Sequence, residues 1–427
     1  HPTLRRQRQM CIRDRSQYPA AYRMAAIIRE NVPMPKLGQF IMKIPLFVII
    51  ALFALPTLSQ DKVYRLDQFG AIGNDSQDDS QAIQTALSSL NPGDILVIPE
   101  GTYDVCQTLY LTNTKQISLI GSQGAVLRKC IDFIGEYLLY IKETQNIFIS
   151  GLHFIGLNNG DIKQVWGEQG VYLASTSGSH LSNNTFENFG DAALRVTTGP
   201  NQGESLSQDA TLFANTFRNC SQVTTTQATQ GSSAPGTQNI AFEYNLFQGC
   251  TLKLSSRHQV QGALVLHNTF KDISSAALEV SYYTDVSVKD NKFDNITGYV
   301  MNVYPNTRAE QPVHWGNVEF HNNDVSDSTM GIRLQSFSAN ESPTKSVENI
   351  SVSHNRFSNI TCEGTNEQKY KKIIRTYSQK SGYSFENVNI VGNEYDGESG
   401  CDFLSIDTSS EKIKIEENTK TLKVDGN

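Results

Sequence analysis

Long amphipathic helical patterns are almost absent from this chain of 427 residues, which argues against helical bundles and helical repeats. Intrinsic disorder is also excluded, because 38% of the residues are hydrophobic and only 19% are charged. A net charge of −7 argues against a general nucleic-acid binder. The seven cysteines follow no zinc-binding spacing. These absences leave a globular protein in which strands, not helices, carry the fold.

A single long apolar run stands in the N-terminal part, after Met42 and Lys43. Residues 1–41 carry eight Arg or Lys against two acidic residues, and we expect them to be a non-native or read-through leader, with Met42 as the start. The run of about fifteen residues is short for a membrane span, so we expect residues 42–59 to be a signal peptide. A type II membrane anchor is the alternative. Export predicts a secreted or periplasmic monomer with no stable membrane association after cleavage.

A short unit of Asn, any residue and Phe recurs through the chain. Alternating apolar strands flank it, as in "GALVLHNTF" and "AALEVSY". Repeats of roughly 23 residues or more with two or three short strands each predict an all-β, single-stranded, right-handed parallel β-helix. We expect each Phe to stack in the interior and each Asn to occupy a left-handed corner, bonded to the Asn one coil away. The units lie at Asn184, Asn215, Asn245, Asn268 and Asn291, with looser versions at Asn322, Asn355 and Asn393.

Six cysteines lie beyond the leader and fall about one coil apart in pairs. Cys220 and Cys250 each follow the Phe of an Asn-x-Phe unit by three residues. Neighbouring strands of a sheet are about 4.8 Å apart, which is within the distance that a disulfide allows. The spacing therefore allows three disulfides or stacked free thiols. The pairs are Cys106/Cys130, Cys220/Cys250 and Cys362/Cys401.

A cap is expected over residues 62–92, where Gln81 to Leu90 forms the one convincing amphipathic helix and covers the open end of the solenoid. The motif "FGAIGNDSQDDSQAIQTA" with the later "PEGTY" resembles the cap of the pectate-lyase-like β-helix superfamily. The resemblance covers about residues 62–410 and leaves 411–427 as a C-terminal tail. It implies fold but not reaction, because lyases, glycoside hydrolases such as polygalacturonases and iota-carrageenases, epimerases and phage tailspikes share this cap. The superfamily's catalytic signatures that we sought are absent, so no site is transferred.

Charged residues recur at one outward position of the strand that follows each Phe. In a chain with net negative charge, a column of four cations and one carboxylate is unusual, and it predicts a site for an anionic polysaccharide. The column is Arg195, Lys253, Glu279, Asn302, Arg333 and Arg375. Tyr304 flanks it, and Arg257, His258, Tyr282 and Tyr283 follow the strand ends.

Long connections are expected at 198–210, 224–238, 304–316 and 336–346, on both sides of two short coils that bear Lys253 and Glu279. We expect these loops to wall a cleft, with Arg308, His314 and Trp315 contributed by one of them. Arg195, Tyr283, Asn302, Tyr304, Arg308, Trp315, Arg333 and Arg375 are the expected substrate-binding residues.

For β-elimination, Lys253 or His258 is the expected base, Arg257 or Arg333 holds the carboxylate, and Tyr282 or Tyr283 donates the proton. Hydrolysis is the alternative and requires a second carboxyl group beside Glu279, for which Glu310 is the best candidate. A Lys253–Glu279 ion pair without function, and a non-catalytic adhesin or tailspike-like binder, also remain open. The sequence indicates no certain cofactor and leaves a calcium requirement open. A one-residue slip beyond Asn322 would exchange inward and outward positions.

Overall fold

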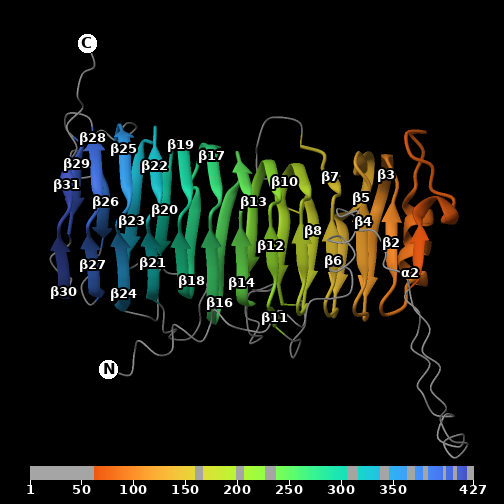
Figure 1. The fold of residues 1–427 in the computed structure, drawn as a ribbon, viewed down its shortest axis with the longest axis horizontal. Helices are drawn as coiled ribbons and strands as arrows, with labels where there is room; N and C mark the ends of the chain where they lie inside the picture. The colour runs from red at the N-terminus through yellow and green to blue at the C-terminus, as the bar shows by residue number, and fades with distance from the viewer. Residues whose placement is uncertain are drawn as a thin grey trace, which may run out of the picture. The chain divides into compact units, whose positions relative to one another are not determined.

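The strands from Val63 onward pair in parallel, coil upon coil, in a computed structural model of the chain (Figure 1). The structure describes residues 62–158, 167–198, 206–226, 237–304, 316–336, 346–362, 371–377, 383–397, 401–406 and 411–420, with the backbone alone at 256–261, 282 and 411. The expected leader and signal peptide therefore lie outside the described residues. In the described part, no helix has the length and apolar character needed to span a bilayer. The predicted right-handed parallel β-helix is confirmed.

Each coil contributes strands to three faces. Face 1 leads into the Asn corner and contains β1 (Val63–Arg65), β2 (Ile95–Ile98), β4 (Ser118–Gly121), β6 (Phe148–Ser150), β9 (His180–Ser182), β11 (Ser207–Gln208), β12 (Thr211–Phe213), β14 (Thr237–Glu243), β21 (Gly316–His321), β24 (Ser346–Ser353), β27 (Ser384–Val391) and β30 (Glu411–Glu416). The second halves of β16 (Thr251–Leu266) and β18 (Leu278–Lys289) complete it.

Face 2 carries the Phe ladder and face 3 follows it. Face 2 contains β7 (His153–Ile155), β15 (Leu246–Gln248), β17 (Thr269–Ile273), β19 (Lys292–Ile296), β22 (Asp324–Ser326), β25 (Arg356–Ile360), β28 (Glu394–Gly397) and β31 (Thr419–Lys420). Face 3 contains β8 (Gln169–Ala174), β20 (Tyr299–Tyr304), β23 (Met330–Gln335), β26 (Lys372–Tyr377), β29 (Asp402–Ser405) and the first halves of β16 and β18. Four long strands bend from face 2 into face 3, namely β3 (Gly101–Thr112), β5 (Ala125–Lys142), β10 (Thr185–Thr197) and β13 (Thr216–Thr226).

The Phe ladder forms the centre of the core. Phe247 and Phe270 stack with ring centroids 4.7 Å apart, and Phe270 and Phe293 lie 4.6 Å apart, all without solvent exposure. Stacking in this way is possible because parallel, in-register coils place identical residues one strand spacing apart. The expected role of the Phe residues is confirmed.

The Asn ladder hydrogen-bonds from coil to coil as expected, with two corrections. The backbone N–H and Nδ2 of Asn245 both donate to Oδ1 of Asn268, at 2.9 and 3.0 Å. The left-handed conformation belongs to the residue before each ladder Asn, such as His267 (φ 55°), and not to the Asn itself. The ladder residue after Asn291 is Asn323, not Asn322, because Asn291 donates to Asn323 and Asn323 to Asn355. Asn322 occupies the left-handed position.

The predicted tail is wrong over residues 411–420, because β30 and β31 pair with β27 and β28 and add another coil. Three disulfides clip neighbouring coils together, in the pairs that the spacing allowed. The Cα–Cα distances are 5.0 Å for Cys106–Cys130, 4.9 Å for Cys220–Cys250 and 5.6 Å for Cys362–Cys401.

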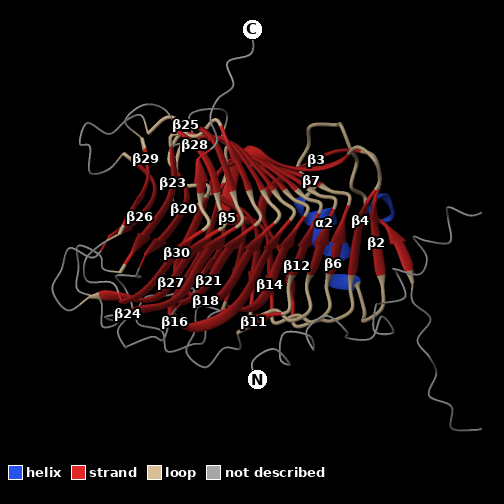
Figure 2. Cartoon of the chain, turned by 60° about the vertical axis from the view of Figure 1, so that its left-hand side comes forward, coloured by secondary structure: helices blue, strands red, loops and turns tan. Residues whose placement is uncertain are grey.

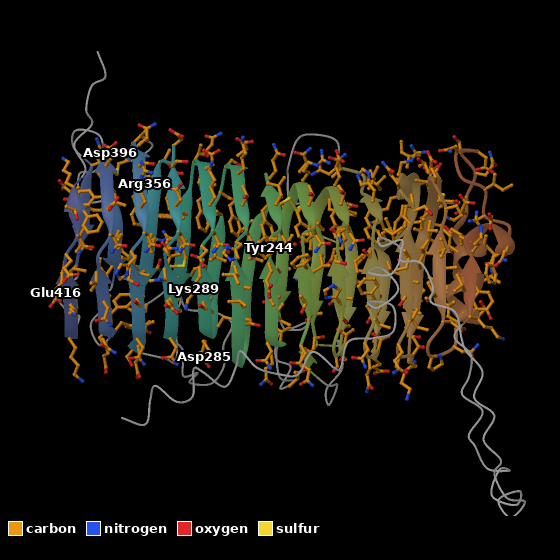
Figure 3. The ribbon with its side chains drawn as sticks, in the orientation of Figure 1. Tyr244, Asp285, Lys289, Arg356, Asp396 and Glu416 are labelled. Carbon is orange, nitrogen blue, oxygen red and sulfur yellow. A yellow bond between two sulfur atoms is a disulfide. The ribbon has the colours of Figure 1, made fainter. Side chains whose placement is uncertain are left out.

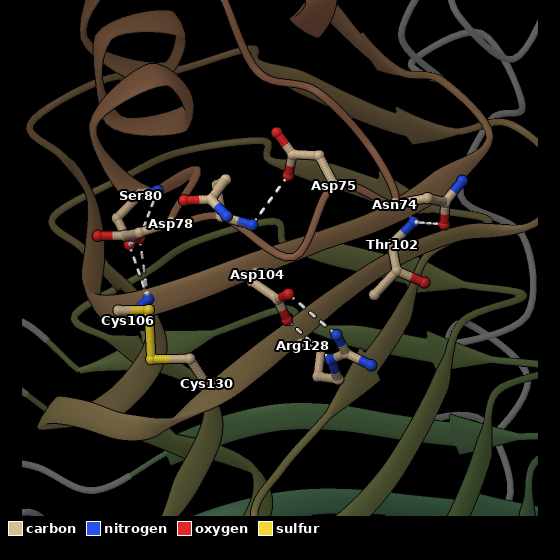
Figure 4. Close-up of polar contacts among 10 residues, drawn as sticks. Asn74, Asp75, Asp78, Ser80, Thr102, Asp104, Cys106, Arg128 and Cys130 are labelled. Atoms are coloured by element: carbon tan, nitrogen blue, oxygen red, sulfur yellow. Dashed lines mark hydrogen bonds and ion pairs between the residues drawn. A yellow bond between two sulfur atoms is a disulfide. The ribbon is translucent and has the colours of Figure 1, made fainter.

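The cap helix α2 (Ser80–Ser89), preceded by the short 3₁₀ helix η3 (Leu66–Phe69), lies at the N-terminal end of the stack (Figure 2). Ile83, Ala86 and Leu87 of α2 are buried, so this helix covers the apolar interior of the first coil, which would otherwise be exposed to water at the end of the stack. Polar contacts attach the cap to the first coils (Figure 4): Asp78 accepts from the Ser80 backbone, and the Ser80 hydroxyl accepts from the Cys106 N–H at 2.8 Å. On the next coil, Arg128 Nε donates to Asp104 at 2.7 Å.

Candidate functional site

Strand register places most of the expected charged residues in one outward column on face 3. Lys253 pairs with Glu279, Glu279 with Asn302, and Asn302 with Arg333, each on the next coil, and Arg375 follows Arg333. No one-residue slip occurs there, since Ile332 and Leu334 on either side of Arg333 are buried. One coil was overlooked: Thr224 lies between Arg195 and Lys253. The column therefore exists, but Arg195 is two coils from Lys253.

Glu279 connects two neighbours through a single oxygen. Its Oε2 lies 3.1 Å from Lys253 Nζ and accepts a hydrogen bond of 2.8 Å from the Tyr304 hydroxyl. The Lys253 and Glu279 side chains are 34% and 23% exposed, and Tyr304 is half-buried. Burial, and then the Glu279 carboxylate, raise the pKa of Tyr304 well above its usual range. Tyr304 therefore keeps its proton at neutral and moderately alkaline pH.

The arginines farther along the column are held in fixed orientations. Arg333 Nε donates to Asn302 Oδ1 at 2.9 Å, and its guanidinium lies 4.4 Å above the ring of Tyr299. The Arg375 guanidinium lies 4.5 Å above the ring of Tyr377. A guanidinium stacked on an aromatic ring keeps its edge available for a planar anion. The half-buried Arg333 is thus placed for contact with a carboxylate or sulfate group, whereas Arg375, like Arg195, is only 9% exposed.

Two expected binding residues are placed differently. Arg195 is only 9% exposed, because its Nε donates to Gln169 at 2.8 Å and its Nη2 lies 3.3 Å from Asp191. Tyr283 is fully buried, and its hydroxyl lies 2.7 Å from that of Thr237, so its predicted outward position is wrong. The cause is β18, which runs unbroken from face 3 into face 1, with the register shifted between Ser255 and Val260. The alternation of outward and inward side chains, counted from Glu279, therefore does not hold where β18 bends from face 3 into face 1.

Other expected site residues lie outside the described residues. Arg308 and Trp315 belong to residues 305–315, as do His314 and Glu310, and the side chains of Arg257, His258 and Tyr282 are not described either. Most residues of the four long connections that were expected to wall the cleft also lie outside the described residues. The prediction that the two coils bearing Lys253 and Glu279 have no insertion is confirmed, because β16 and β18 continue unbroken past these residues.

Sequence reasoning missed a group of tyrosines on the same column. Tyr110, Tyr140 and Tyr172 pair in register, and Tyr172 pairs with Arg195. The signal was present in "LYL", "LYI" and "VYL", which repeat the inward–outward–inward pattern of "LKL" and "LEV". The prediction did not include these tyrosines because it started from the first Asn-x-Phe unit at Asn184, which follows all three of them in the chain.

A calcium site finds no support on this face. Among the described residues, no three His, Cys, Asp or Glu side chains are grouped as metal ligands. The Glu279 carboxylate already contacts a lysine ammonium, whereas calcium is bound by several oxygen ligands.

Comparisons with known proteins agree with this architecture. The family described as rhamnogalacturonase A/epimerase, pectate lyase-like, matches residues 65–162. No curated protein sequence matches the chain. Among solved structures, the adhesin PfbA of Streptococcus pneumoniae has 16% identity and a TM-score of 0.63, over 84% of this chain and 97% of that chain.

An α-1,3-glucanase catalytic unit from Streptomyces thermodiastaticus has 12% identity and a TM-score of 0.55, over 86% of this chain and 69% of that chain. The Dettilon tailspike protein has 13% identity and a TM-score of 0.51, over 84% of this chain and 66% of that chain. At these identities the likeness shows the fold alone. The coil architecture and the family match over residues 65–162 support a likeness to the pectate-lyase-like superfamily of parallel β-helices.

Proposed function

We propose that this protein binds an anionic polysaccharide along face 3 and degrades it by β-elimination at Lys253, Glu279 and Tyr304. The observation that carries the proposal is the single Glu279 oxygen that contacts both the Lys253 ammonium and the Tyr304 hydroxyl, in a column that continues to Arg333. Three groups capable of proton transfer thus adjoin a cation that suits a uronate carboxylate.

The elimination step assigns one task to each group. Arg333 binds the uronate carboxylate and so acidifies the hydrogen on C5. Lys253, after its ammonium has released a proton to solvent, takes the C5 proton, the C4–O4 bond breaks, and a C4=C5 double bond forms. The leaving O4 takes its proton from Tyr304, the role we had expected of Tyr282 or Tyr283. Glu279 then returns a proton from Lys253 to Tyr304, since its Oε2 contacts both groups.

Arg333 also assists the proton donor. Its positive charge offsets part of the rise in the Tyr304 pKa that burial and Glu279 cause, which favours the transient phenolate. Hydrolysis is the other way in which an enzyme could cleave the polysaccharide, and it needs two carboxyl groups, one on each side of the scissile bond. Among the described residues of this column, Glu279 supplies the single carboxylate. Elimination is therefore the better-supported reaction.

Binding without cleavage is the second candidate. The observation in its favour is the Lys253–Glu279 ion pair, because an ammonium paired with a carboxylate resists acting as a base. The similarity to a pneumococcal adhesin is compatible with such a role. Export fits both candidates, since three disulfides persist in oxidising compartments.

Incubation with pectate, alginate, chondroitin and carrageenans distinguishes these functions. Growth of ultraviolet absorbance from the unsaturated product indicates a lyase, and new reducing ends without it indicate a hydrolase. Binding with neither indicates an adhesin. For a lyase, Lys253→Ala and Tyr304→Phe should each lower kcat by about 100-fold or more.

The control is Lys289→Ala on face 1 (Figure 3). Lys289 pairs with Glu319 at 2.8 Å and is 34% exposed, as is Lys253. Each of the two variants therefore loses one ion pair between neighbouring strands, and only Lys253→Ala should impair elimination. Full activity of Lys253→Ala would refute the assigned chemistry.

A further inference from the structure

The tyrosines on face 3 form a compact group next to the cap, which we call the tyrosine platform: Tyr110, Tyr137, Tyr140 and Tyr172. The ring of Tyr172 lies 4.5 Å from that of Tyr137 and stacks on Tyr140 at 5.4 Å. Tyr110 meets the edge of Tyr140 at 5.9 Å. Four rings from three consecutive coils thus support one another on an outward surface.

Exposure separates the platform from the protein core. Tyr172 is 7% exposed and forms the base, whereas Tyr137 and Tyr140 are half-buried and Tyr110 is 51% exposed. The interior of the coils is filled mainly by Phe and aliphatic side chains. A half-exposed tyrosine contributes little to stability, so stability alone does not explain Tyr110. Rings held rigidly by their neighbours are suitable for stacking on the apolar face of a pyranose, because little side-chain freedom is lost on binding.

The platform is continuous with the proposed site. From Tyr140, the register runs through Tyr172, Arg195 and Thr224 to Lys253, which is four steps along the stack. Four strand spacings correspond to about 19 Å. An extended polysaccharide advances by about 5 Å per pyranose, close to the ~4.8 Å between coils, so a chain lying along the column places about one sugar on each coil.

A cavity of about 670 Å³ adjoins the platform at the cap. Tyr110 lines it together with Leu87 and Leu90 of the cap region, and Lys115, Glu143 and Gln145 add polar groups. The cavity therefore combines apolar and polar walls, as sugar sites do. It also lies at the end of the column, where a polysaccharide running over the platform would arrive.

We propose that the tyrosine platform is a second glycan subsite, which stacks on pyranose rings of the bound chain about four sugars away from Lys253. The subsite recognises ring faces and not charge, so it takes charged and uncharged sugars alike. Burial raises the pKa of Tyr172 to about 12 and raises the pKa of Tyr137 well above its usual range, so both hydroxyls stay protonated at neutral pH. The position of the subsite relative to the cleaved bond rests on the proposed function.

Chain length provides the test. Binding is measured by calorimetry with oligomers of two to three and of about eight sugars prepared from pectate, alginate, chondroitin and carrageenan, and with a neutral β-glucan of about eight sugars. Tyr110→Ala and Tyr140→Ala should weaken binding of the long oligomers roughly three- to tenfold. Short oligomers bound at Lys253 do not reach the platform, so their affinity should not change.

The control is Tyr244→Ala (Figure 3). Tyr244 is 54% exposed and contacts His267 at 4.8 Å, but it lies outside the column. Unchanged binding of long oligomers by both platform variants, or an equal loss for short and long oligomers, overturns the platform. A loss confined to the neutral β-glucan supports the platform while contradicting the anionic site. If the wild-type protein binds no long oligomer, both proposals fail.

Discussion

Replacing Asn268 with alanine tests whether the Asn ladder holds the coils together through buried hydrogen bonds. Asn268 is 1% exposed, and its side chain takes part in four bonds with three neighbours. Its Oδ1 accepts from the backbone N–H and Nδ2 of Asn245, and its Nδ2 donates to the Phe242 carbonyl and to Asn291 Oδ1.

The expected loss follows from what each neighbour retains. Asn245 Nδ2 still donates to the Leu212 carbonyl, and Asn291 Oδ1 still accepts from the Asn268 backbone N–H. The Asn245 N–H loses its ladder acceptor and the Phe242 carbonyl loses its ladder donor, both in buried surroundings. Each buried unsatisfied group costs about 1–3 kcal/mol, so for two groups the free energy of unfolding should fall by roughly 2–6 kcal/mol.

Urea unfolding followed by circular dichroism measures this loss as a shift of the midpoint at unchanged slope. Asn389→Ala is the control, because Asn389 lies half-buried on β27 and takes part in none of the side-chain hydrogen bonds found among the described residues. A loss below about 1 kcal/mol for Asn268→Ala, or one equal to that of the control, would refute the reasoning.

Three further predictions concern the core and the coil contacts. Phe270→Ala should lower the free energy of unfolding by about 3–5 kcal/mol, because it opens a cavity in the Phe stack. Phe213→Ala is the control and should lower it much less, because Phe213 is 37% exposed. Gly331→Ala should destabilise by about 1–3 kcal/mol, since a Cβ there would lie 2.3 Å from the Ile373 carbonyl oxygen; thermal melting measures this. Burial raises the pKa of Tyr283 from 10.0 to about 12, so the folded protein keeps a proton that the unfolded chain releases above pH 10. Between pH 10 and 12 the protein should lose about 3 kcal/mol of stability from this group, and Tyr283→Phe should show a smaller loss over that range in chemical unfolding.

The alternation of apolar residues and the Asn-x-Phe spacing were sufficient to predict the parallel β-helix, the cap helix and the pairing of Lys253 with Glu279. A solenoid allows this because each coil contacts only its neighbours, so counting from one ladder Phe to the next gives the register. The looser unit "HNNDV" shows the limit of counting. Two adjacent asparagines fit the pattern, and only the hydrogen bonds from Asn291 and to Asn355 identify Asn323 as the ladder residue.

The sequence by itself determined which residues face inward along straight strands, because side-chain direction alternates with a fixed period of two. Only the tertiary structure decided what happens where the chain bends between faces. There the alternation breaks and Tyr283 turns into the core, while Arg195 keeps its outward position but is drawn into hydrogen bonds with Gln169 and Asp191. The link from Lys253 through Glu279 to Tyr304 likewise depends on three coils in register, a proximity that no local pattern contains.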